Sequence, residues 1–94
     1  MNQKLMTWKN DQTDNLCQAF LKLRDVDEVY NFLEDLATIG EIKSMAQRLE
    51  VAKLLKEAKT YPEIVEATGA STATISRVKR CLEYGTGGYS SVLE

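Results

Sequence analysis

Helix breakers are almost absent from the interior of this 94-residue chain, and this feature constrains its fold more than any other. Pro62 is its one proline, and three of its five glycines, Gly85, Gly87 and Gly88, lie in the last ten residues. Proline and glycine are the residues that interrupt helices most strongly. The interior of the chain is therefore free to be helical over most of its length.

Apolar residues recur with the period of a helix through the first half of the chain. Leu16, Phe20 and Leu23 fall at i, i+4 and i+7, which places them on one stripe of a helix. A second helix is predicted after Asp25, which can cap it, with Glu28 three residues later. Its apolar stripe consists of Val26, Val29, Tyr30 and Leu33, widened by Phe32 and Leu36. The pattern predicts an all-α fold.

The longest predicted helix spans roughly residues 39–58 and begins with a capping box, in which Thr38 is followed by Glu41. Its broad apolar band consists of Ile42, Met45, Ala46, Leu49, Val51, Ala52, Leu54 and Leu55. A helix that is apolar on most sides is buried on most sides. Because a core of this size is marginal alone, we expect a second copy of the chain to cover part of this band. The alternative is that the whole band lies in the core of a monomer.

Residues 61–80 follow the pattern of a helix-turn-helix. Thr60 and Glu63 form a capping box for its first helix, and Gly69 suits the left-handed backbone of the turn. Ser71 is expected to cap the second helix, which runs to about Tyr84. The residues predicted to form the turn and fill the corner are Ile64, Val65, Gly69, Ala70, Ile75 and Val78.

The outward face of that second helix carries hydroxyl residues near its start and basic residues further along. Small side chains permit close approach to base edges in a major groove, and basic side chains reach phosphates or guanines. Residues 69–82 contain three basic side chains and no acidic one, although the whole chain has a net charge of −2. Double-stranded DNA is therefore the expected partner, the alternative being a merely hydrated face. The predicted DNA-binding residues are Ser71, Thr72, Ala73, Thr74, Ser76, Arg77, Lys79 and Arg80.

Several function classes are disfavoured by what the sequence lacks. It has no histidine, the commonest general base and metal ligand, and no glycine-rich phosphate loop or nucleophile motif. Cys17 and Cys81 are expected to be free thiols that are buried as small hydrophobic residues, and without further ligands they do not make a zinc site. We therefore predict neither an enzyme nor a bound metal or cofactor. The sequence also lacks a signal-peptide-like run and a membrane span, which predicts a cytoplasmic protein.

Three short segments resemble the Trp repressor family, namely Leu54-Leu55, Thr68-Gly69-Ala70 and Ala73-Thr74-Ile75-Ser76-Arg77. The whole chain looks closest to the Trp-repressor-related YerC/YecD group of Gram-positive bacteria. The resemblance implies a bundle of about five helices that forms an intertwined homodimer, with two recognition helices entering successive major grooves. We accordingly assign residues 1–59 to the N-terminal helices and dimerisation core, 60–84 to the DNA-binding helix-turn-helix, and 85–94 to a flexible glycine-rich tail.

The resemblance also implies a vestigial effector pocket, formed by Gln47, Arg48, Arg77, Val78 and Cys81. Family members that bind tryptophan hold its indole between two arginines, of which one falls on Arg77 and the other on Gln47. Arg48 is a poor substitute, because one residue along a helix rotates the side chain by roughly 100°. Val78 stands where those members have glycine, and Cys81 stands where they have a serine that helps hold the ligand. We therefore predict that tryptophan is not the co-repressor.

The sequence as a whole predicts a sequence-specific DNA-binding transcription regulator that acts as a dimer. Two alternatives stay open from the sequence alone. One is a helical protein-interaction module that has lost DNA binding and uses acidic residues such as Glu34, Asp35 and Glu41 toward a basic partner. The other is a regulator that responds to an unknown small-molecule effector.

Overall fold

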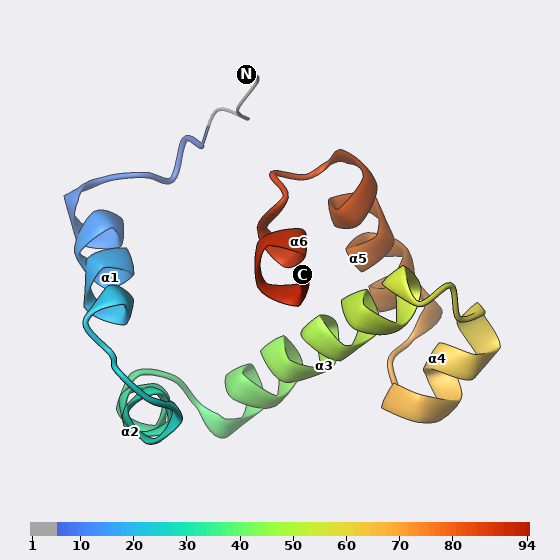
Figure 1. Cartoon of the computed structure of the whole chain (residues 1–94), viewed down its shortest axis with the longest axis horizontal. Helices are drawn as coiled ribbons and strands as arrows, with labels where there is room; N and C mark the ends of the chain where they lie inside the picture. The colour runs from blue at the N-terminus through green and yellow to red at the C-terminus, as the bar shows by residue number, and fades with distance from the viewer. Residues whose placement is uncertain (1–5) are drawn as a thin grey trace. The chain divides into compact units, whose positions relative to one another are not determined.

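The computed structural model describes residues 6–94, which form six helices and no strand (Figure 1). The helices are α1 (Asp11–Leu21), α2 (Val26–Leu36), α3 (Ile39–Lys56), α4 (Tyr61–Thr68), α5 (Thr72–Tyr84) and α6 (Gly88–Leu93). The all-α fold is confirmed, with a sixth helix where about five were expected. None of the helices within residues 6–94 has the length and apolar character that crossing a membrane requires.

Side-chain caps fix where the helices begin. Asp25 accepts a hydrogen bond from the backbone N–H of Glu28 at 2.9 Å, so α2 starts where the sequence predicted. Thr38 and Glu41 form the predicted capping box of α3, with N···O distances of 2.8 and 3.1 Å. The same contacts, chiefly the backbone N–H of Thr38, lower the pKa of Glu41. Asn10 caps α1, a role that the sequence analysis did not assign.

The chain divides into two compact units, residues 1–42 and residues 43–94. This division follows packing, whereas the predicted parts 1–59 and 60–84 were drawn by role, so the two boundaries differ. Residues 1–5, the start of the predicted dimerisation part, lie outside the described residues. In the first unit, Phe20 of α1 packs edge to face on Phe32 of α2, with ring centroids 5.1 Å apart. No side chain within residues 6–42 is fully buried in a single copy.

The core of the second unit is formed by the C-terminal half of α3 together with α4 and α5. Its fully buried residues are Val51, Ala52, Ile64, Ala70, Ile75 and Val78, each at most 2% exposed. Four residues of this set, Ile64, Ala70, Ile75 and Val78, are among those predicted to fill the corner of the helix-turn-helix. Val65 was predicted to join them, but this was wrong, since Val65 is 38% exposed. It follows the buried Ile64 directly, and one step along a helix turns a side chain away from its neighbour's surroundings.

The glycine-rich segment 85–94 is not the loose tail that its composition suggested, because it contains α6. Tyr89 and Leu93, at i and i+4, pack against the core of the second unit. The Lys56 ammonium lies 3.4 Å from Ser90 Oγ and 3.1 Å from a carboxylate oxygen of Glu94. The glycine content predicted a flexible segment. The segment is helical instead, because two apolar side chains one helical turn apart pack against the core.

Two residues with positive φ lie just after α3 and α4 and end these helices. Ala58 has a φ of 61° and closes α3, with the N–H of Lys59 donating to the carbonyl of Leu54 at 3.1 Å. Gly69 has a φ of 72° and closes α4. Alanine in the left-handed region is strained by its Cβ, whereas glycine is not. The chain therefore carries glycine at one of these turns and a strained alanine at the other.

We expect Ala58→Gly to raise the free energy of unfolding by about 0.5–1 kcal/mol, because relief of left-handed strain exceeds the added entropy of the unfolded chain. Gly69→Ala is the matched opposite change, and it should lower the free energy of unfolding by about 1 kcal/mol. No atom lies within 4 Å of a Cβ built on Gly69, so backbone strain alone is tested there. Urea unfolding followed by circular dichroism measures both variants. A less stable Ala58→Gly protein would contradict this account of the turn.

Candidate nucleic-acid interface

The corner between α4 and α5 is secured by hydrogen bonds within the turn itself. Thr68 Oγ1 donates to the carbonyl of Ile64 at 2.7 Å and accepts from the N–H of Ala70 at 3.1 Å. The N–H of Gly69 donates to the carbonyl of Val65 at 2.8 Å. The predicted role of Gly69 as the turn residue is confirmed, and the hydroxyl of Thr68 is an addition that the sequence analysis missed. Together these contacts fix the direction in which α5 leaves the turn.

The N-terminus of α4 is held by the predicted capping box. Thr60 N–H donates to a carboxylate oxygen of Glu63 at 2.9 Å, and the N–H of Glu63 donates to Thr60 Oγ1 at 3.3 Å. The backbone N–H of Thr60 is the main reason that the pKa of Glu63 is lowered. Since the ionised carboxylate makes the cap, this contribution to stability is present above about pH 4.5 and is lost as the pH falls through the lowered pKa.

At the start of α5, two of the predicted DNA-binding hydroxyls contact each other. Ser71 caps the helix by accepting from the N–H of Thr74 at 3.1 Å, and the two side-chain oxygens are also 3.1 Å apart. Thr74 is half-buried, while Ser71 is exposed. Ser71 is thus a structural cap first, and contact with DNA would use the remaining hydrogen-bonding capacity of these hydroxyls.

The remainder of α5 separates into a buried stripe and an exposed ridge. Ile75 is fully buried and Val78 is 1% exposed, as predicted, and Leu82 continues the stripe as a partly buried residue. The ridge between these positions is exposed, and it consists of Thr72, Ala73, Ser76, Arg77, Lys79 and Arg80. The structure therefore brings the three predicted basic residues and two of the predicted hydroxyl residues, Thr72 and Ser76, onto one exposed surface. Their contact with DNA stays a prediction.

Tyr61, the first residue of α4, belongs to the same surface and was missed by the sequence analysis. Its ring packs partly against the core, and its hydroxyl lies 3.4 Å from Ser76 Oγ. The Lys79 ammonium lies 5.9 Å from the centre of the Tyr61 ring, within the range of a cation–π contact. The signal available in the sequence was an aromatic residue beside the cap of the first helix, but nothing local pairs it with residues 15 and 18 positions later.

The chain matches the family described as Trp repressor protein over residues 11–94. It belongs to the Trp repressor family. Among curated proteins, YerC of Bacillus subtilis (strain 168), described as uncharacterized, is 54% identical over 86 residues, covering 92% of this chain and 83% of YerC. The resemblance read from the three segments is thereby confirmed.

Two crystal structures extend the comparison to three dimensions. A TrpR-like protein from Eubacterium eligens ATCC 27750 is 57% identical, with a TM-score of 0.87 and coverage of 89% of this chain and 87% of that one. A candidate Trp repressor from Staphylococcus aureus is 47% identical, with a TM-score of 0.87 and coverage of 90% and 85%. The helical arrangement is therefore shared with experimentally solved members of the family.

The residues predicted to form a vestigial effector pocket differ in their contacts and in their burial. Gln47 donates from Nε2 to the backbone carbonyl of Thr68 at 3.1 Å. Arg48 turns back along its own helix to the carbonyl of Ser44, at 3.4 Å. The remaining members separate by burial, since Val78 lies in the core whereas Arg77 and Cys81 are exposed. Cys17 is exposed as well, so the expectation that both cysteines are buried was wrong.

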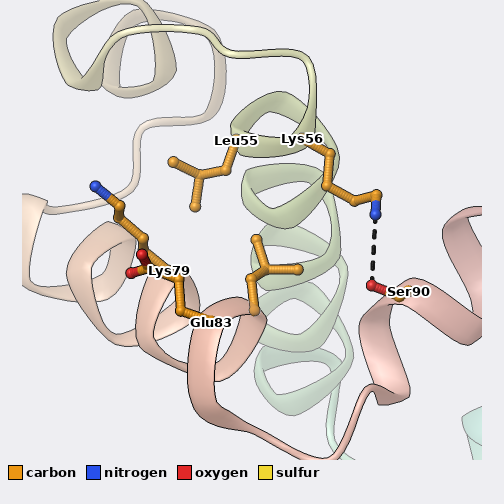
Figure 2. Close-up of a pocket in the computed structure, with 6 residues that line it drawn as sticks. Leu55, Lys56, Lys79, Glu83 and Ser90 are labelled. Carbon is orange, nitrogen blue, oxygen red and sulfur yellow. Dashed lines mark hydrogen bonds between the residues drawn. The ribbon is translucent and has the colours of Figure 1, made fainter.

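A hollow of about 280 Å³ is lined by residues of α3, α5 and α6 (Figure 2). Its lining residues are Leu55, Lys56, Lys79, Leu82, Glu83 and Ser90, none of which belongs to the predicted pocket. Figure 2 shows Lys56 joined to Ser90 at one rim and Lys79 at the other. Within residues 6–94 no cluster of histidine, cysteine or acidic residues is arranged to hold a metal ion.

Proposed function

We propose that this protein is a sequence-specific DNA-binding transcription regulator whose helix α5 enters the major groove. The observation that carries the proposal is the exposed ridge of α5, which bears three basic side chains, while Ile75 and Val78 of the same helix are buried in the core. Membership of the Trp repressor family and the helix-turn-helix corner support it. Both the family and the fold are regulatory rather than enzymatic. A regulator of the chromosome in a bacterium works in the cytoplasm, where we place the protein.

The residues of the ridge divide into two proposed roles. Those nearest the start of α5 would approach base edges, because a recognition helix presents its N-terminal residues to the floor of the groove. Basic side chains further along would contact phosphates, which set affinity and register more than sequence preference. The proposed base-reading residues are Thr72, Ala73 and Ser76 of the ridge together with the half-buried Thr74 beside it, and the proposed phosphate contacts are Arg77, Lys79 and Arg80.

Lys79→Ala and Arg80→Ala should each weaken binding several-fold across many duplex sequences. Each change should also lower the slope of log affinity against log salt by about 1, because one phosphate contact is lost. Fluorescence anisotropy with random and selected duplexes at several salt concentrations measures both effects. Lys53→Ala, an exposed change on α3 outside the helix-turn-helix, is the control. Unchanged affinity and slope in both α5 variants would remove these residues from the interface.

We further propose that the active form is a homodimer, interlocked through the N-terminal helices. The support is the first unit, which exposes apolar side chains that no core of its own covers. Leu21, Val26 and Tyr30 are 79%, 68% and 68% exposed in a single copy. Exposed apolar area on this scale is typical of surfaces that meet a partner. A second copy would give α1 and α2 the burial that they lack.

Multi-angle light scattering should report a mass of about twice the 10.6 kDa of the chain. Phe20→Glu should shift the protein toward monomer or unfold it, since a charge would enter the interface, whereas Gln18→Glu on the same helix should not. The melting temperature of the unmodified protein should also rise with concentration, as mass action requires of a dimer that folds on association. A concentration-independent mass of one chain would contradict the dimer.

Tryptophan is not the co-repressor in this proposal. The Val78 side chain is 1% exposed and occupies the corner, and the Gln47 amide already has an internal partner. Isothermal titration of the protein with L-tryptophan should therefore give no saturable heat up to millimolar ligand. DNA affinity should likewise be the same with and without the amino acid. A dissociation constant in the micromolar range would overturn this part of the proposal.

A further inference from the structure

One side chain of α3 reaches the turn of the helix-turn-helix. Gln47 Nε2 donates to the backbone carbonyl of Thr68 at 3.1 Å, across 21 residues of sequence, in a half-buried position. Thr68 is the last residue of α4, where the carbonyls of a helix have no partner within it. The contact therefore satisfies a group that the helix itself leaves open, and it does so from another helix.

The turn that Gln47 contacts is restrained by further hydrogen bonds of its own. The Thr68 hydroxyl is used twice, toward Ile64 and Ala70, and the N–H of Gly69 returns to Val65. These hydrogen bonds make residues 68–70 a locally rigid turn. A hydrogen bond from α3 to this rigid turn therefore also restrains the position of the start of α5, which begins two residues later at Thr72.

The apolar core alone does not set the angle of α4 and α5 on α3. Burial of Val51, Ile64 and Ile75 is strong but non-directional, so packed surfaces can rotate or slide with little change in buried area. A hydrogen bond weakens steeply when it is bent, which makes it a directional restraint. Gln47 lies one helical turn before Val51 on the same face of α3, so it adds a second, directional attachment point beside the core.

We propose that Gln47 is a positioning residue, which sets the orientation of the helix-turn-helix on α3 and so the separation of the two recognition helices in the dimer. The inference rests on the proposed dimeric DNA-binding function. Paired recognition helices must meet half-sites about one helical turn of DNA apart. A small rotation of each helix-turn-helix changes the spacing that they fit, while each half-site can still be read.

The test first selects DNA half-sites and their best spacing from a random duplex pool with the unmodified protein. It then compares Gln47→Glu and Gln47→Arg on duplexes with that spacing and with one base pair more or less. Glutamate has the same shape and, when ionised, cannot donate to Thr68, whereas arginine keeps an N–H donor. Gln47→Glu should reduce the preference for the best spacing by up to about five- to tenfold, which is the most that the loss of one restraining hydrogen bond can contribute. Base preference within a half-site should be unchanged, and Gln47→Arg should keep the unmodified protein's spacing preference. Arg48→Gln, which removes only a local contact, is the matched control.

Amide hydrogen exchange gives a second readout that needs no DNA. In Gln47→Glu, exchange at Gly69 and Ala70 should accelerate at least several-fold, while the core amide of Val78 stays protected. A general loss of stability would accelerate all three together and would count against positioning. Unchanged exchange at the turn, or an unchanged spacing preference, overturns the inference. Failure of the unmodified protein to bind any duplex would instead overturn the proposed function, and exchange would still decide the role of Gln47.

Discussion

Burial of one stripe of α5 is the interaction on which the rest of the structure depends. Ile75 and Val78 pack with Val51 of α3 and Ile64 of α4, and none of the four is more than 1% exposed. Because a helix turns by about 100° per residue, fixing two positions on its inner side decides which residues face outward. Small changes in this stripe would therefore rotate the whole ridge. The residues that it leaves outside are Thr72, Ala73, Ser76, Arg77, Lys79 and Arg80.

Packing and polar contacts have different tasks in this corner. The apolar core supplies most of the free energy, and it tolerates small rotations because it is non-directional. The polar groups of the turn, Thr68 and Gly69, contribute less free energy but fix the backbone path between the two helices. Tyr61 adds a contact between the first helix and the ridge, through Ser76 and Lys79. The proposed DNA-binding surface needs both kinds of contact, since contacts to bases require a defined helix angle as well as a stable fold.

The helix ends and the helix-turn-helix could be predicted from the sequence because their signals are local. A capping box such as Thr60 and Glu63 joins residues three apart, and an apolar stripe repeats within one helix. The bond from Gln47 to Thr68 joins residues 21 apart, and no periodic pattern encodes such a pair. The prediction of a flexible tail for residues 85–94 was wrong for another reason. Glycine content indicates backbone freedom, but it carries no information on the apolar surface against which a short helix can pack.

A helix-turn-helix that is held by its own side chains has a consequence for regulation. Val78 fills the corner and Gln47 joins the turn to α3, so both positions are occupied by the protein's own side chains. If the protein binds DNA as a dimer, as we propose, control of DNA binding falls to the step that brings two such surfaces together. If the first unit folds fully only on pairing, occupancy of a two-fold operator depends on the square of the monomer concentration below the dissociation constant of the dimer. For a regulator of this kind, the amount of protein in the cell would itself control occupancy of the operator.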